Sequence, residues 1–287
     1  MVGKVVKRRV WPEIQMSITN ALYVAAVIIP SKEDPTRSVC SGIFLHEYWV
    51  ATAASCFIGR KVRDRQAVVI FGVDDYTAET VNELRSLDVW LHPEYSGPPN
   101  ANDIALIKLR RSDKVQMDKS KIVYGDHYDY APGYYWYTYP HLTDENKCIA
   151  IGFPNNIYND TVLNLDIYYI NYKWSGCGCK KNNRSFVCGK LSSYSPSCFI
   201  YKGGPLICQG MVLGIGSAAY HCGTNDTLCS LETFFSFTYL CSYFRWISKY
   251  VPNFPRQCYS MMSSAPAKSP FIIHHLTFII FIIIAFN

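Results

Sequence analysis

Residues Ser197–Cys208 read Ser-Cys-Phe-Ile-Tyr-Lys-Gly-Gly-Pro-Leu-Ile-Cys, so two cysteines enclose a turn and a short apolar run. Gly-Gly-Pro indicates a sharp turn, because glycine adopts backbone angles that are closed to other residues and proline interrupts a regular ladder. The apolar residues that follow favour a buried strand. We therefore interpret this stretch as a turn, bracketed by cysteines, that opens a strand.

Length and composition place the chain among folded proteins. It has 287 residues, of which 49% are hydrophobic, enough for a sizeable core. The net charge is +6, but the basic residues are scattered except in Lys4–Arg9. Nucleic-acid arms need blocks of like charge. The sequence therefore indicates no nucleic-acid partner.

Cysteines and glycosylation signals indicate the compartment. The chain has twelve cysteines and three Asn-x-Ser/Thr sequons, at Asn159, Asn183 and Asn225. Disulfides persist and glycosylation occurs in oxidising, secretory compartments, so we expect an extracellular protein. Cys177-Gly178-Cys179 lacks the two-residue gap of zinc knuckles, so we predict neither a metal site nor a cofactor.

The hydrophobic pattern is that of an all-β protein. Short runs rich in valine, isoleucine and tyrosine alternate with turn residues, which suits a barrel or sandwich. The clearest runs are Gly42–Leu45, Val68–Phe71, Ile104–Leu109, Cys148–Gly152, Ile167–Tyr172 and Met211–Ile215. Only Cys241–Val251 has helical periodicity, with Tyr243, Trp246, Ile247 and Tyr250 on one face and Pro252 as the stop.

The first apolar stretch resembles a signal peptide only loosely. The basic segment Lys4–Arg9 precedes the apolar residues 21–29, but Trp11–Asn20 separates the two. A signal peptide places its basic and apolar regions next to each other. We therefore predict that Leu22–Ile29 is the first core strand and that residues 1–20 are an N-terminal segment.

Several motifs, taken in order, resemble those of the trypsin/chymotrypsin-like serine protease family (peptidase S1). Trp49–Cys56 read Trp-Val-Ala-Thr-Ala-Ala-Ser-Cys, similar to the family's Trp-Val-Leu-Thr-Ala-Ala-His-Cys, and Cys40–Ile43 resemble its Cys-Gly-Gly-Ser. Asn102–Leu109 are close to the family's Asn-Asp-Ile-Ala-Leu-Leu-Lys-Leu, and Ser197–Cys208 resemble its nucleophile loop.

The resemblance implies two antiparallel Greek-key six-stranded β-barrels and a C-terminal α-helix. A homology domain would span residues 21–252, with barrels at about 21–123 and 146–240 and a helix at 241–251. Residues 124–145, rich in tyrosine, would link the barrels. Pro/Ser-rich residues 253–270 and a hydrophobic tail, 271–287, would follow.

The same alignment implies a degenerate catalytic triad. Ser55 stands at the position of the family's histidine, and Lys202 stands at the position of its nucleophilic serine. Asp103 is the one triad residue that is kept. Ser55 cannot take a proton near neutral pH, and a nearby carboxylate favours the charged form of Lys202. We expect Lys202 to contact Asp103. Tyr201 replaces the aspartate that pairs with the new N-terminus on activation, so we expect no activation switch.

One enzymatic alternative is a Ser55–Lys202 dyad with Ser55 as nucleophile, since unrelated proteases use such pairs. Ile200 stands at the oxyanion-hole glycine, where a β-branched side chain resists unusual backbone angles, which argues against a dyad.

The resemblance also implies a changed specificity pocket. Pro196 would lie at the floor of the pocket, and Ser217 to Ala219 would form its substrate-binding strand. Phe235 stands where the family has a glycine that lets a side chain enter the pocket. A phenyl ring at Phe235 is expected to fill the pocket.

Disulfide pairs implied by the resemblance are Cys40–Cys56, Cys148–Cys208 and Cys198–Cys222, with Cys188 joined to Cys177 or Cys179. The remaining member of that last pair, with Cys229, Cys241 and Cys258, would form further bridges whose pairing the sequence leaves open.

The C-terminal tail suggests attachment to a membrane. Residues 271–287 have no formally charged side chain. Ser263 and Ser264 fit the attachment site of a glycolipid anchor, although the polar spacer is shorter than the usual length of about 8–12 residues. A short transmembrane helix is the alternative.

These features together predict a catalytically inactive serine protease homologue, similar to the non-catalytic homologues of insects. It would be secreted or held at the outer cell surface and would bind an extracellular protein as a regulatory cofactor, decoy or adhesive factor. A low-activity endopeptidase using the dyad is the alternative.

Overall fold

The computed structural model describes residues 23–30, 38–97, 102–110, 147–154, 161–171, 177–179, 185–191, 201–208, 211–223 and 232–254. The chain divides into two compact units, Met1–Arg256 and Gln257–Asn287, and every described residue belongs to the first. Several predictions lie outside the described residues: segment 1–20, linker 124–145, the tail, the sequons Asn159, Asn183 and Asn225, Pro196, Cys198, Cys229, Cys258, and the anchor residues Ser263 and Ser264.

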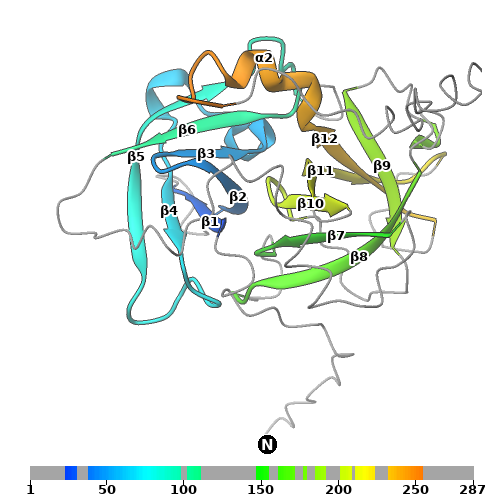
Figure 1. Cartoon of the computed structure of the whole chain (residues 1–287), viewed down its shortest axis with the longest axis horizontal. Helices are drawn as coiled ribbons and strands as arrows, with labels where there is room; N and C mark the ends of the chain where they lie inside the picture. The colour runs from blue at the N-terminus through cyan, green and yellow to red at the C-terminus, as the bar shows by residue number, and fades with distance from the viewer. Residues whose placement is uncertain are drawn as a thin grey trace, which may run out of the picture. The chain divides into compact units, whose positions relative to one another are not determined.

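Twelve strands form two closed six-stranded antiparallel barrels, as the sequence predicts (Figure 1). The first barrel contains β1 (Val24–Ile29), β2 (Ser38–His46), β3 (Trp49–Thr52), β4 (Val68–Phe71), β5 (Asn82–Leu91) and β6 (Ala105–Leu109), in the order β1-β2-β3-β6-β5-β4. The second contains β7 (Lys147–Gly152), β8 (Asn164–Asn171), β9 (Phe186–Leu191), β10 (Pro205–Cys208), β11 (Met211–Tyr220) and β12 (Phe234–Tyr239), in the order β10-β11-β12-β9-β8-β7.

The apolar runs become strands because the barrel interior buries them. Strands β1 and β3 are buried along their whole length, and Val27, Val50, Val69 and Ile107 are fully enclosed in the core of the first barrel. Strand β5 instead alternates buried and exposed residues near its start, the pattern of a strand with one face in water. The core of this barrel is therefore formed by branched aliphatic side chains that suit a pleated sheet.

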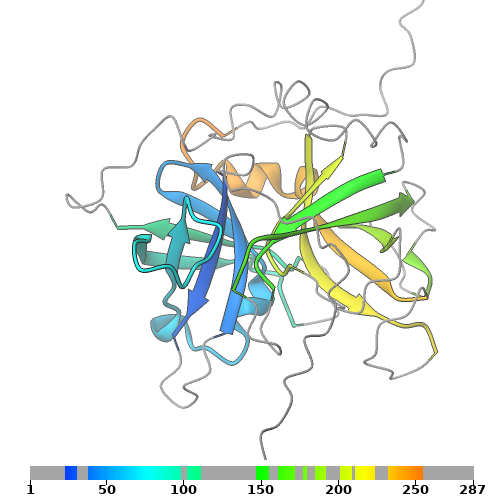
Figure 2. The ribbon, with the colours of Figure 1, turned by 90° about the horizontal axis from the view of Figure 1, so that it is seen from below.

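The C-terminal helix is shorter than predicted. Residues Leu240–Tyr243 form the 3₁₀ helix η7, and only Phe244–Ile247 form the α-helix α2. The predicted aromatic face does pack inward: Trp246 and Tyr243 each meet the His92 ring edge-on, at centroid distances of 5.0 and 5.2 Å. These contacts hold α2 against the first barrel (Figure 2). Packing rather than helix length therefore stabilises this segment.

A buried serine links the two barrels. The Ser41 hydroxyl of β2 accepts a hydrogen bond from the Phe153 N–H at 2.8 Å and donates to the Phe153 carbonyl at 3.2 Å. The Ser41 N–H donates to the Lys202 carbonyl at 2.7 Å. Because Phe153 follows β7 and Lys202 precedes β10, these bonds fix the second barrel's loops against the first barrel.

Four disulfides join described cysteines, and they confirm three of the predicted pairings and correct one. Cys40–Cys56 and Cys148–Cys208 form as predicted, and Cys188 pairs with Cys177. The predicted Cys198–Cys222 bridge is wrong, because Cys222 is bonded to Cys179.

The Cys177–Cys179 turn explains that correction. Gly178 has a φ of 58°, which turns neighbouring cysteines toward different partners. The Tyr220 hydroxyl of β11 donates to the Cys177 carbonyl at 2.8 Å and so holds the turn beside the end of β11. Cys179 therefore lies next to Cys222, with their Cα atoms 5.5 Å apart.

Candidate functional site

Asp103 lies where the two barrels meet and is positioned by the backbone just before β6. The preceding Asn102 has a φ of 67°, a left-handed conformation that asparagine tolerates better than most residues. The Tyr243 hydroxyl accepts from the Asn102 N–H at 3.1 Å and donates to the Asn102 side-chain oxygen at 3.0 Å. Asp103 itself is 3% exposed. The C-terminal segment therefore helps to hold this carboxylate inside the protein.

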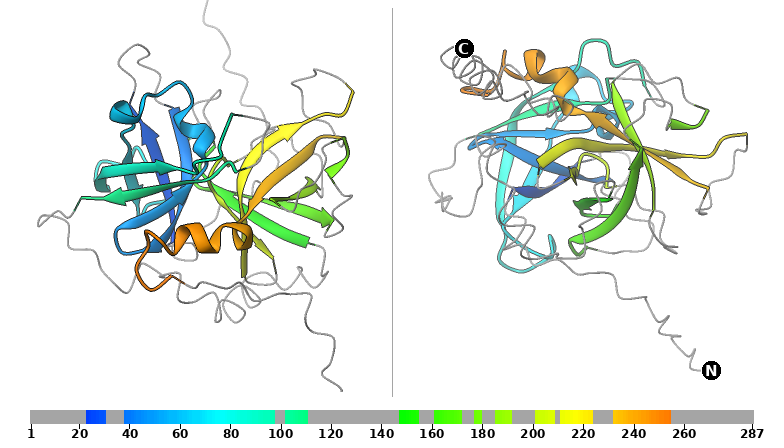
Figure 3. Two further views of the ribbon diagram at one scale, coloured as in Figure 1. Left: turned by 90° about the horizontal axis from the view of Figure 1, so that it is seen from above. Right: turned by 45° about the vertical axis from the view of Figure 1, so that its right-hand side comes forward.

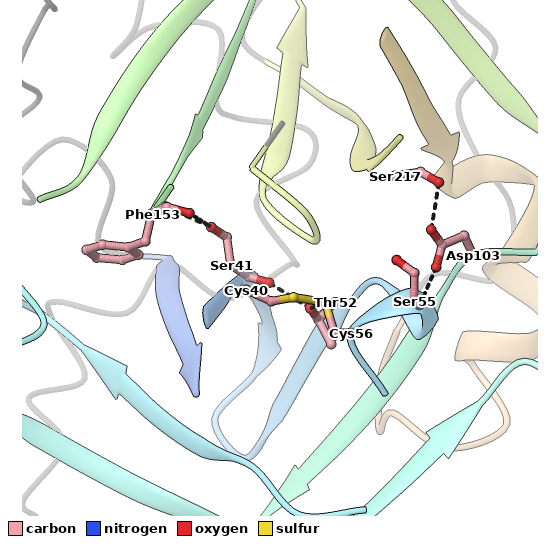
Figure 4. The surroundings of a disulfide bond; sticks show 8 residues. All are labelled: Cys40, Ser41, Thr52, Ser55, Cys56, Asp103, Phe153 and Ser217. Atoms are coloured by element: carbon pink, nitrogen blue, oxygen red, sulfur yellow. Dashed lines mark hydrogen bonds between the residues drawn. A yellow bond between two sulfur atoms is a disulfide. The ribbon is translucent and has the colours of Figure 1, made fainter. Parts of the chain in front are cut away.

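Three hydrogen bonds fix Asp103, and Figure 4 shows the two that its carboxylate accepts. Its carboxylate accepts from the Ser55 backbone N–H at 2.7 Å and from the Ser217 hydroxyl at 2.6 Å. Its carbonyl accepts from the Thr238 hydroxyl at 2.9 Å. Ser217 and Thr238 belong to β11 and β12, so the second barrel supplies two of the three donors to a residue of the first.

Burial raises the pKa of the Asp103 carboxyl above its ordinary value of 3.8. The hydrogen bonds from Ser217 and Ser55 oppose this rise, and the positive charge of Lys202 opposes it more weakly. Desolvation prevails because the carboxylate has lost nearly all contact with water. The hydrogen-bond donors thus compensate only part of the cost of burying the charge.

Ser55 meets Asp103 through its backbone and not through its hydroxyl. It lies in the 3₁₀ helix η2 (Ala54–Phe57), which the Cys40–Cys56 disulfide ties to β2. Its Oγ atom is buried and has no hydrogen-bond partner of good geometry. The Ser55 side chain lies near enough to Asp103 to lower the pKa of that carboxyl, but no hydrogen bond of good geometry joins the hydroxyl to a base.

The side chain of Lys202 forms no ion pair with Asp103 among the described residues, so the direct contact predicted from the sequence is absent. The two carboxylate oxygens instead accept from the Ser217 hydroxyl and the Ser55 N–H. Lys202 influences Asp103 only through its charge. Nor does Lys202 bond the Ser55 hydroxyl, which has no partner in this part of the chain, so the hydrogen bond of a Ser55–Lys202 dyad is not formed.

The backbone around Lys202 is fixed more firmly than its half-buried side chain. The Gly203 N–H donates to the Gly216 carbonyl, and the Gly216 N–H donates to the Gly204 carbonyl, both at 2.8 Å. Gly203 has a φ of 80°, and a Cβ atom there would collide with the Ser41 carbonyl. Only glycine therefore fits this position of the loop.

Tyr201 fills the space beside this loop. It is 4% exposed, and its Cβ atom lies so close to Gly152 that a Cβ at that glycine would overlap it. The loop conformation thus forms around a buried phenol ring in place of an acidic side chain.

The predicted pocket residues fall into two groups. Ser217 binds Asp103, and Ala219 lies half-buried two residues farther along β11. Phe235 of β12 is fully buried, and its ring centroid lies 5.1 Å from that of Tyr168 in an edge-to-face arrangement. The Phe237 ring, also in β12, likewise lies edge-on to Tyr168, with a centroid distance of 5.3 Å. The three rings form a closed aromatic cluster in the second barrel.

A family model described as trypsin matches residues 15–247, most of the chain. The chain belongs to the trypsin family. Trypsin of Squalus acanthias is 28% identical over 223 residues, covering 75% of this chain and 86% of that protein. Kallikrein-7 of Homo sapiens is 24% identical over 218 residues, covering 73% of this chain and 76% of that protein.

Solved structures agree on the fold. HL collagenase has a TM-score of 0.60 at 20% identity and covers 84% of this chain and 97% of its own. Neuropsin of mouse brain has a TM-score of 0.57 at 23% identity and covers 82% and 96%. The trypsin-family fold and its disulfides are typical of extracellular proteins. Among the described residues, no helix is long and apolar enough to cross a membrane.

Sequence reasoning missed Tyr168, whose ring contacts both Phe235 and Phe237. Tyr168 lies in a run with the alternation of a β-strand. This pattern predicts which face of the strand carries the side chain, but it does not predict which residues of other strands contact it. The pairing of Thr238 with the Asp103 carbonyl was missed for the same reason, because the two residues are far apart in sequence.

Proposed function

We propose that this trypsin-family member is catalytically inactive and acts outside the cell by binding another protein, as a regulatory cofactor, decoy or adhesive factor. The observation that carries this proposal is the surroundings of Asp103. Its carboxylate receives a backbone N–H from Ser55 and a hydroxyl from Ser217, and neither can serve as a general base. In the family mechanism an imidazole at the first of these positions takes the nucleophile's proton.

The nucleophile position supports the same proposal. A lysine ammonium has no lone pair with which to attack a carbonyl, and the negative charge of Asp103 favours that charged form of Lys202. The resemblance places Phe235 at the specificity pocket, where a buried phenyl ring would take up space that a substrate side chain needs. A protein that lacks the base, the nucleophile and the pocket can still present the surface of its disulfide-bonded fold to a binding partner.

Attachment to the outer cell surface is part of the proposal. The uncharged tail 271–287 and the small residues Ser263 and Ser264 fit a glycolipid anchor, and the alternative is a short transmembrane helix. A phosphatidylinositol-specific phospholipase applied to cells that express the whole chain should release the protein into the medium. Retention on the cells after treatment would favour the helix.

The test of inactivity uses a fluorophosphonate probe and a peptide-substrate library, with bovine-type trypsin as the positive control. The wild-type protein should neither label nor cleave. The double variant Ser55→His/Lys202→Ser restores the triad residue types, and we expect little activity from it while Phe235 remains in place. Adding Phe235→Gly to that variant is the change most suited to recover cleavage.

Two results would contradict the proposal. The first is labelling of the wild-type protein that Ser55→Ala abolishes, because it would identify Ser55 as a nucleophile and support the dyad alternative. The second is cleavage of peptides by wild type that survives repeated purification and is lost in Lys202→Ala.

A further inference from the structure

We propose that Ile58–Arg65, here called the basic loop, is a docking surface for an acidic segment of a partner protein that also carries an apolar side chain. The loop joins η2 to β4 and reads Ile-Gly-Arg-Lys-Val-Arg-Asp-Arg. This inference deepens the proposed function, on which it rests, because it names the place of binding and the chemistry of the partner.

Three of the four cations of the basic loop have no acidic partner in the described part of the chain. Arg60, Lys61 and Arg65 form no ion pair with any residue in the described part of the chain, where the printed sequence offers only Asp64 as an acid within the loop. The buried Nε atom of Arg65 has no acceptor. Like charges held close together repel, so a carboxylate-bearing partner that pairs with the exposed cations would relieve this repulsion.

Exposed aliphatic side chains lie between these charges. Ile58 is 52% and Val62 72% exposed, and they are two of the four large hydrophobic residues that stand exposed among those described; the others are Leu87 and Tyr169. Single exposed hydrophobic residues are ordinary. Ile58 and Val62 lie within five positions of each other in the basic loop, so a partner could make both charged and apolar contacts with it.

The basic loop is already ordered. Residues Val62–Asp64 form the 3₁₀ helix η3. The Asp64 N–H donates to the Lys61 carbonyl at 2.9 Å, and the Arg60 N–H donates to the Phe57 carbonyl at 3.1 Å. A partner would not have to order this backbone, which lowers the entropic cost of binding.

The position of the basic loop suits a partner that does not enter the former active site. Helix η2, which carries Ser55, lies near the second barrel, whereas η3 lies on the outer side of the first barrel (Figures 1 and 3). A sulfated polysaccharide would use the charges but would leave Ile58 and Val62 in water. A protein segment that mixes glutamate and leucine uses both features, so it is the occupant that the observations favour.

The experiment measures binding of a fluorescein-labelled peptide of repeating Glu-Glu-Leu, about twelve residues long, to the full chain by fluorescence anisotropy. The test variant is Arg60→Gln/Lys61→Gln. The matched control is Arg245→Gln/Lys249→Gln, which removes the same charge from exposed residues of the C-terminal segment that form no ion pair within the described structure. Val62→Ser probes the apolar contact. Circular dichroism checks that all variants remain folded.

We expect the test variant to bind about tenfold more weakly, the control to change less than about twofold, and Val62→Ser to lose about threefold. Equal losses in test and control would overturn the proposal, because they would indicate a response to net charge alone. Undetectable binding by wild type would also overturn it, as would full competition by a heparin oligosaccharide with no effect of Val62→Ser. Peptide cleavage by the wild-type protein would refute the proposed inactivity without altering this binding result.

Discussion

The surroundings of Asp103 and those of Phe235 are held together in opposite ways, one by hydrogen bonds and the other by packed rings. Around Asp103 the hydrogen bonds from Ser55 N–H, Ser217 and Thr238 are all in place, although no imidazole is there to use the carboxylate. Around Phe235 a ring fills space against Tyr168. Removing a member of a buried polar network leaves its partners unpaired, whereas filling a pocket adds hydrophobic burial. If the protein is inactive as proposed, the hydrogen bonds around Asp103 persist because breaking them costs free energy, whereas a ring that fills a pocket carries no such cost.

Removal of the Phe235 ring is expected to have the largest effect on this contrast. Phe235→Ala should lower the free energy of unfolding by about 3–5 kcal/mol, because the ring is fully buried between aromatic neighbours. Chemical denaturation measures the change. Phe235→Leu, which keeps most of the apolar volume, should cost less. A loss below about 1 kcal/mol for the alanine variant would mean that the ring is not part of the core.

The loop glycine tests how firmly the Lys202 segment is fixed. Gly203→Ala should cost about 2–4 kcal/mol, since its φ is 80° and the new Cβ would collide with Ser41 and Thr52. Gly223→Ala is the matched control: its φ is 85°, but no atom lies within 4 Å of the added Cβ. It should show only the backbone strain, about 1 kcal/mol. Equal losses would argue against a tightly packed loop.

Asp103→Asn tests whether the carboxylate's charge or its hydrogen bonds matter. The folded-state pKa is raised above 3.8, so the native protein holds a proton that the unfolded chain releases between the two values. The unfolding free energy therefore falls as pH rises through this window, and the ionised carboxylate lowers stability at neutral pH.

An asparagine can still accept from the Ser55 N–H and hydrogen-bond Ser217, so Asp103→Asn should be no less stable than wild type at neutral pH. Its advantage should shrink as pH falls through the raised folded-state pKa of Asp103 toward 3.8, and should change no further below 3.8. Asp103→Ala leaves both donors unpaired and should cost about 1–3 kcal/mol. Urea unfolding across pH measures both. An asparagine variant as unstable as the alanine variant would show that the charge itself is stabilising.

Lys202→Ala should have the smallest effect, within about 0.5 kcal/mol, because backbone bonds and not the ammonium hold the loop. The same substitution should raise the pKa of Asp103 further, since the charge of Lys202 lowers it. NMR titration of the carboxyl carbon measures that shift. A large loss of stability would instead support the direct Lys202–Asp103 contact that the sequence predicted.

Local patterns predicted the fold well and the contacts within the site only in part. The run Val68–Phe71 is β4, and the run Ile104–Leu109 contains the whole of β6, because strand periodicity is a property of neighbouring residues. The length of the helix predicted at Cys241–Val251 was overestimated, since only Phe244–Ile247 form an α-helix. Its aromatic residues pack on His92 and the first barrel, and helix length depends on that packing.

The sequence by itself determined most of the strands, and it predicted an oxidising environment and the replacement of catalytic residues by Ser55 and Lys202, since each follows from residue type and local spacing. The tertiary structure alone decided that Ser217 and not Lys202 bonds the Asp103 carboxylate, that Cys222 pairs with Cys179, and that Tyr168 meets Phe235. Each of these contacts joins residues distant in the chain. Which of several compatible partners meet depends on how the closed barrels bring their strand ends together.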